Sequence, residues 1–206
     1  MVKISIPINE QQREVKQQYF SFSVRAQAIM LAGSRNRELP PAVCDTLVTK
    51  LYSLGFHFFV GCAKGIDLSF RKALARAPMN KNTFVACAFY KSMKQENTFG
   101  LYASVGVPDK IPPAAALARR TVWMARRCQF LILFPDDPIT QKWGKGSTLA
   151  FNSAVLNLKP VFVVSKSEPP AAPLYNIFPT SLFNIVKGCW VVPHPYSQGG
   201  ICEDEW

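Results

Sequence analysis

The segments IMLAGSR (residues 29–35) and FHFFVGCAKGID (residues 56–67) decide the fold of this chain. Each begins as a continuous apolar run and ends in a turn with glycine, and apolar residues at helical spacing follow each turn. Apolar runs of this length are typical of strands buried on both faces. Their alternation with helices predicts an α/β fold, an open and mostly parallel sheet with helices on both faces.

The same alternation divides the chain into three parts. Residues 27–166 are expected to form the main domain, 1–26 an N-terminal extension, and 167–206 a C-terminal extension packed on the same domain. Residues 90–113 fit neither pattern and are expected to be a long irregular excursion. The expected strands are 28–32, 56–60, 83–89, 130–134 and 160–164, with a short element at 190–192 and a short strand at 3–7; the expected helices are 10–18, 41–54, 66–75, 114–127 and one from the turn at 144–148 to about 156.

Composition restricts the partners. The 206 residues carry a formal net charge of +11 at pH 7, which favours polyanionic partners. Six cysteines form no CxxC pair, and with two histidines no set has zinc spacing, so we expect neither a metal nor a cofactor. No apolar run approaches the roughly 20 residues of a membrane span, and the N-terminus lacks a secretion signal. We therefore expect a cytoplasmic protein without a membrane partner.

Three turns that precede helices combine glycine with a cation. In a parallel sheet all three turns lie at the same edge, where the strands have their carboxyl ends. Unpaired N–H groups at a helix N-terminus, with a cation beside them, form a binding site for phosphate. Asp67 is an anion in this setting and is expected to cap its helix or to hold a nearby arginine. The predicted phosphate-binding residues are Gly33, Ser34 and Arg35, then Gly61, Cys62, Ala63, Lys64, Gly65 and Asp67, then Lys145, Gly146, Ser147 and Thr148.

Cys62 has two interpretations. It is either a small residue that fills a tight turn, or a thiol whose pKa is lowered by its place at a helix N-terminus.

The predicted helix 114–127 has a basic face around one aromatic residue. Arg119, Trp123, Arg126 and Arg127 fall on one side at spacings of three, four and seven, and Arg120 flanks them. Cations around a ring suit single-stranded nucleic acid, in which phosphates meet the cations and bases stack on the ring. The alternative is a solvated basic face with Trp123 tucked against a neighbouring loop. Arg119, Arg120 and Trp123 join the predicted site.

Catalytic groups are hard to find in this sequence. His57 and His194 have no obvious serine or cysteine partner. Asp136 and Asp137 follow a predicted strand, where a metal or a catalytic acid could be placed, but their flanking prolines favour a surface turn. We predict no catalytic residue.

The turns resemble the DNA-processing protein A (DprA/Smf) family, within a wider Rossmann-like group that includes the Lonely Guy nucleotide hydrolases. Residues 33–35 match the family's G-S-R, and 60–67 match S-G-x-A-x-G-I-D with Val60 in place of serine. Residues 146–150 resemble the family's G-S-x-x-T-A-like turn, whereas 119–121 keep only the first arginine of R-N-R. The resemblance covers residues 27 to 165.

The resemblance implies a Rossmann-like domain that binds single-stranded DNA in DNA processing and recombination. It also implies homodimers and a recombinase partner. One alternative is a sensor domain that binds a small nucleotide in the same three turns. The other, hydrolysis of a nucleotide N-glycosidic bond, needs a glutamate where this chain has Phe151 and Asn152, and is disfavoured.

Overall fold

The computed structural model describes residues 27–76, 78–89, 101–104, 111–167, 169 and 173–194. The extension expected for residues 1–26, with its strand and helix, lies outside these residues, as do most of the expected excursion 90–113 and residues beyond 194. In the part that is described, no helix is long and apolar enough to cross a bilayer.

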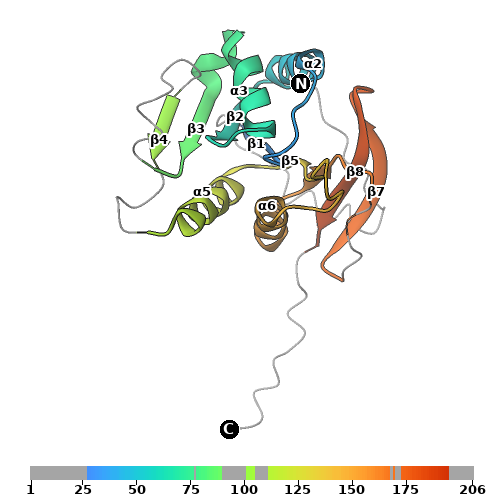
Figure 1. Cartoon of the computed structure of the whole chain (residues 1–206). Coiled ribbons are helices and arrows are strands. Elements are labelled where there is room, and N and C mark those ends of the chain that lie inside the picture. The colour runs from blue at the N-terminus through green and yellow to red at the C-terminus, as the bar shows by residue number, and fades with distance from the viewer. Residues whose placement is uncertain are drawn as a thin grey trace.

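Strands and helices alternate as predicted over much of the described chain (Figure 1). In chain order they are β1 (Gln27–Gly33), α2 (Pro41–Ser53), β2 (Phe56–Gly61), α3 (Ile66–Arg76), the 3-10 helix η2 (Pro78–Asn82), β3 (Thr83–Cys87), β4 (Leu101–Ser104), α5 (Pro113–Arg127), β5 (Leu131–Phe134), α6 (Lys145–Leu156), β6 (Val161–Val163), β7 (Tyr175–Leu182) and β8 (Val186–Pro193).

One eight-stranded sheet has the order β4-β3-β2-β1-β5-β6-β8-β7. The strands β1 to β6 pair in parallel, and only the contacts of β8 with β6 and β7 are antiparallel. The chain winds outward from β1 to β4, then returns to place β5 on the other side of β1. This confirms the α/β class and puts a switch in strand order between β1 and β5, where such sheets bind ligands.

Alternate residues of each strand enter opposite cores. On β1, Ile29 and Leu31 pack with the α2 and α3 side, whereas Met30 and Ala32 pack with the α5 and α6 side. Helices therefore cover both faces, as the sequence predicts (Figure 1). We call the side where β1, β2, β3, β5 and β6 end the carboxyl edge.

The C-terminal part of the sheet differs from the prediction. In place of a short element at 190–192, the hairpin of β7 and β8 extends the sheet through eight register pairs. Its turn requires positive φ at Phe183 and Asn184 (55° and 60°), and Ile185 N donates to Leu182 O at 3.0 Å. Such turns are usually marked by glycine, and Pro179 within β7 also argues against a strand, so the hairpin has no clear sequence signal.

The described residues of the predicted excursion include a strand. Leu101–Ser104 forms β4, which pairs in parallel with β3 at the edge of the sheet.

Candidate functional site

The first two predicted turns lie against each other at the carboxyl edge. They follow adjacent strands, and Ile66 N donates to Ser34 O at 3.1 Å. Gly65 has φ +73°, and a Cβ there would lie 2.5 Å from Ser34 O, so no side chain fits. Arg35 and Lys64 are both exposed beside this contact.

A buried ion pair crosses the end of β2 inside these turns. Arg120 comes from α5 and Asp67 from α3, on opposite sides of the sheet, and Arg120 Nη2 lies 3.6 Å from Asp67 Oδ2. The two residues are 7% and 5% exposed. A Cβ on Gly61 would collide with Asp67 Oδ2 and lie 2.8 Å from Arg120 Cζ. Gly61 therefore makes room for an ion pair that joins the two helical layers.

The backbone of the second turn is also occupied from inside. Arg71, 2% exposed, donates to Gly61 O at 2.5 Å and to Ala63 O at 2.8 Å. The Ala63 N–H donates to the Asp67 carboxylate. Burial raises the pKa of Asp67 above its ordinary value, against the lowering effects of Arg120 and Arg71. The Asp67 carboxylate thus lies where the sequence predicts a bound phosphate. In this turn, the exposed Lys64 is the group that a ligand can still contact.

Asp67 holds an arginine, which is one of the two roles expected for it. Its partner, Arg120, which the sequence placed beside the basic face of the helix and in the predicted site, is buried. Helical spacing could not show this, because the residue that draws Arg120 inward is 53 positions away in the sequence.

Cys62 lies beside the same arginine. Arg120 Nη1 donates to Cys62 Sγ at 3.4 Å, whereas the Cys87 thiol donates to Val85 O at 3.9 Å. The neighbouring Cys87 side chain, with Arg120 adding to its effect, lowers the pKa of Cys62 to about 5 although burial opposes the shift. The lowering has its causes in Cys87 and Arg120, whereas an effect of the helix N-terminus stays a prediction.

The third turn is open. Gly144 precedes α6, and no side chain caps this helix. A Cβ on Gly144 or Gly146 would meet nothing within 4 Å. Lys145 and Thr148 are exposed, but the Thr148 hydroxyl donates to Gly144 O at 3.3 Å and Ser147 is buried. The first turn of α6 thus offers backbone N–H groups and a lysine, rather than hydroxyls, to an anion.

The basic face of α5 is built differently from the expectation. Trp123 packs on the sheet, with ring centroids 5.6 Å from Phe59 and 5.4 Å from Phe84, and the Arg127 guanidinium lies over its ring at 4.4 Å. Base stacking on Trp123 would require Arg127 to move. Arg119 remains exposed.

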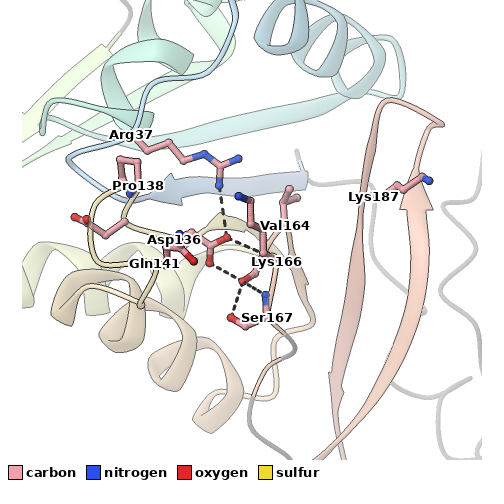
Figure 2. Close-up of a pocket in the computed structure, with 10 residues that line it drawn as sticks. Arg37, Asp136, Pro138, Gln141, Val164, Lys166, Ser167 and Lys187 are labelled. Carbon is pink, nitrogen blue, oxygen red and sulfur yellow. Dashed lines mark hydrogen bonds and ion pairs between the residues drawn. The ribbon is translucent and has the colours of Figure 1, made fainter.

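A cavity of about 620 Å³ opens at the carboxyl ends of β5 and β6 (Figure 2). None of the predicted site residues lines it. Arg37, Lys166 and Lys187 supply three cations, against the carboxylates of Asp136 and Asp137. Lys166 follows a predicted strand, but its loop has no glycine and precedes no predicted helix, so the pattern that selected Arg35 and Lys64 does not include it. Lys187 lies in the hairpin that was not predicted.

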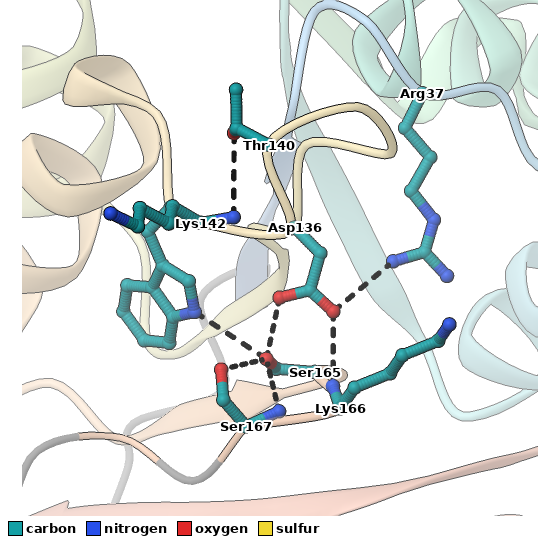
Figure 3. Close-up of polar contacts among 8 residues, drawn as sticks. Arg37, Asp136, Thr140, Lys142, Ser165, Lys166 and Ser167 are labelled. Carbon is teal, nitrogen blue, oxygen red and sulfur yellow. Dashed lines mark hydrogen bonds and ion pairs between the residues drawn. The ribbon is translucent and has the colours of Figure 1, made fainter.

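Asp136 organises one wall of this cavity (Figure 3). It accepts hydrogen bonds from Ser165 Oγ at 2.5 Å and Lys166 N at 3.0 Å, and lies 3.9 Å from Arg37 Nη1. Ser165 Oγ also accepts from Trp143 Nε1 at 3.4 Å. Asp136 therefore fixes the loop after β6 against the loop after β5.

Asp137 has a similar structural role. It accepts from Asn36 Nδ2 and from the N–H groups of Ile139 and Thr140, and these bonds lower its pKa. Both aspartates thus build a turn, and among the described residues no cluster of His, Cys, Asp or Glu could hold a metal ion.

No family model matches the chain, and no curated protein matches it. A structure of DNA processing protein A from Helicobacter pylori, described as binding single-stranded DNA, is similar with 20% identity and a TM-score of 0.49. The similarity covers 71% of this chain and 67% of that one. Likeness at this level carries no conclusion about function.

Proposed function

We propose that the carboxyl edge binds the phosphate groups of single-stranded DNA. The observation that carries the proposal is an exposed cation in each of four loops at this edge: Arg35, Lys64, Lys145 and Lys166. The loops belong to the neighbouring strands β2, β1, β5 and β6, which span about 14 Å at the usual strand spacing. Such a row suits an extended polyanion.

Most of the described anions near these loops are enclosed by the chain. Asp67, Asp136 and Asp137 are each at most 9% exposed and are held by hydrogen bonds or ion pairs. Glu38 is exposed and offsets one cation. The ligand would cross the edge from outside, because the inner side of the turn 61–65 is already filled.

Single-stranded DNA is preferred among polyanions because residues 33–35 and 60–67 resemble the DprA/Smf motifs. The role in DNA processing and recombination, the homodimer and the recombinase partner implied by that resemblance all depend on this binding.

The test is fluorescence anisotropy with a labelled oligothymidylate at increasing salt. Four phosphate contacts give a slope of log Kobs against log salt of about −3, and Lys64→Ala reduces it by about 0.7. Lys50→Ala is the matched control, since Lys50 is exposed in the last turn of α2, at the opposite edge of the sheet. Affinity that does not depend on salt, or equal losses in the two variants, would refute the proposal.

The open end of α6 permits a second matched pair. Lys145→Ala removes a charge, and Lys145→Pro removes the same charge and one N–H. Proline fits this position, because it is the first helical residue and Gly144 before it is extended (φ −71°, ψ 154°). If the N–H groups bind phosphate, the proline variant binds about fivefold more weakly than the alanine variant. Equal affinities would leave only the lysine in contact.

The cavity at β5 and β6 favours a second candidate function, the binding of a small nucleotide. Its volume of about 620 Å³ is in the range of small-molecule sites, and Arg37, Lys166 and Lys187 surround it. If the cavity binds a nucleotide, nucleoside monophosphates raise the melting temperature of the protein and Lys187→Ala removes this rise. Oligothymidylate then does not bind. That pattern would replace the first proposal.

A further inference from the structure

Two reduced thiols lie side by side at the ends of β2 and β3. Gly61 pairs with Ala86 in the parallel register, so Cys62, the first residue after β2, stands beside Cys87, the last residue of β3. Strands about 4.8 Å apart place neighbouring residues inside the Cα range of about 4.4–6.8 Å that a disulfide requires. Both side chains belong to the α2 and α3 side of the sheet. The register and the shared side of the sheet thus bring the two thiols together.

The groups around Cys62 stabilise its negative charge. Arg120 reaches it from α5, and its Nη1 donates to Cys62 Sγ at 3.4 Å. Asp67 on α3 is the opposing anion, but it is paired with the same arginine. Burial and the charge on Cys62 raise the pKa of Cys87, which remains a thiol until Cys62 reacts.

The other described cysteines provide an internal contrast. Cys44 and Cys128 are fully buried and Cys189 is 7% exposed, and burial raises the pKa of Cys128 to about 12. Cys62 is partly exposed, so an oxidant can reach it. Accessibility and thiolate character, which together decide the reactivity of a cysteine, coincide at Cys62.

We propose that Cys62 and Cys87 form a hydroperoxide-reactive dithiol, in which Cys62 reacts first and Cys87 converts the product to an intramolecular disulfide. The Cys62 thiolate attacks one peroxide oxygen, an S–O bond forms, and the O–O bond breaks. The leaving oxygen takes a proton to become water or an alcohol. Cys87 then loses its proton and attacks the Cys62 sulfur, and the S–O bond breaks to release water. The two thiols supply the two electrons that reduce the peroxide.

The first test uses the reduced, full-length chain and one equivalent of hydrogen peroxide at pH 7. Peptide mapping without reductant yields a 62–87 cross-linked peptide, while Cys44 and Cys128 stay reduced. In the Cys87→Ser variant the reaction stops at a sulfenic acid on Cys62, which dimedone traps. The Cys62→Ser variant gives neither the sulfenic acid nor the disulfide. A cross-link between any other pair, or oxidation spread evenly over the cysteines, would overturn the proposal.

The second test needs no variant. The rate of Cys62 alkylation by iodoacetamide is followed by mass spectrometry from pH 8 to pH 6. If Cys62 is already a thiolate at pH 6, its alkylation rate falls less than about twofold between pH 8 and pH 6. The rate of an ordinary thiol falls roughly a hundredfold over the same interval. A hundredfold loss at Cys62 would show an ordinary thiol and remove the first step.

Discussion

Two turns at the same edge of the sheet contain glycine and lysine, yet their backbones meet different surroundings. In the turn 61–65, Asp67 and Arg71 hold the backbone, and Arg120 fills the space over Gly61. At the start of α6, no side chain caps the helix and the space beside Gly146 is open. The same local pattern thus encloses an internal ion pair in one place and leaves a helix N-terminus exposed in the other. The difference depends on Arg120, which arrives from a distant helix.

The largest effect is expected from removing the arginine of the closed turn. Arg120→Met leaves the Asp67 carboxylate buried without the cation that lies 3.6 Å from its Oδ2, and loss of one partner of a buried pair costs about 3–5 kcal/mol. Urea unfolding at pH 7 measures the loss, which should shrink in acid because Asp67 is then protonated. Arg119→Met is the matched control, since Arg119 is exposed on the same helix and should change stability by no more than about 0.5 kcal/mol. Equal losses in both variants would mean that the pair does not stabilise the closed turn.

The pH dependence of stability tests the second anion of the closed turn. The pKa of Cys62 is about 5 in the folded chain and 9.0 ordinarily, so the unfolded chain binds more protons between these values. The contribution of Cys62 is therefore present above pH 9, and it is lost as the pH falls through about 5. The slope approaches 1.4 kcal/mol per pH unit at most, or roughly 2–3 kcal/mol between pH 6 and 8.

Cys62→Ser isolates this contribution, because the variant should lose most of that slope in urea unfolding at pH 6 and 8. Asp67 acts in the opposite direction. Burial raises its pKa, so its contribution decreases as the pH rises from 3.8 through the folded value, and this trend remains in the variant. An unchanged slope in Cys62→Ser would contradict a thiolate at this position.

Most of the fold follows from local sequence signals, whereas the closed turn does not. Glycine-terminated apolar runs at 29–33 and 56–61 predict parallel strands, because few other structures bury such runs on both faces. The hairpin around Phe183 lacks a glycine turn, and its prediction fails for that reason. The ion pair of Arg120 with Asp67 depends on which helix faces which strand end, information that one sequence does not contain.

Gly61→Ala tests whether the closed turn has any room. The added Cβ would collide with Asp67 Oδ2 and lie 2.8 Å from Arg120 Cζ, so we expect a loss of about 1–3 kcal/mol in urea unfolding. In the Arg120→Met background the same change should cost less, because one of the two obstacles is gone. Additive losses would show that Gly61 matters for the backbone conformation rather than for the pair.

The smallest effect is expected at the open turn, where Gly146→Ala should stabilise the protein. Gly146 is the second residue of α6 with open space beside it, and alanine in a helix is favoured over glycine by about 0.5–1 kcal/mol. The substitution keeps the N–H group, so oligothymidylate affinity should change less than about twofold, well within the fivefold effect of one lost hydrogen bond. Thermal unfolding and anisotropy on one preparation measure both quantities. A destabilised variant would mean that the space beside Gly146 is filled in solution, and the contrast between the two turns would then disappear.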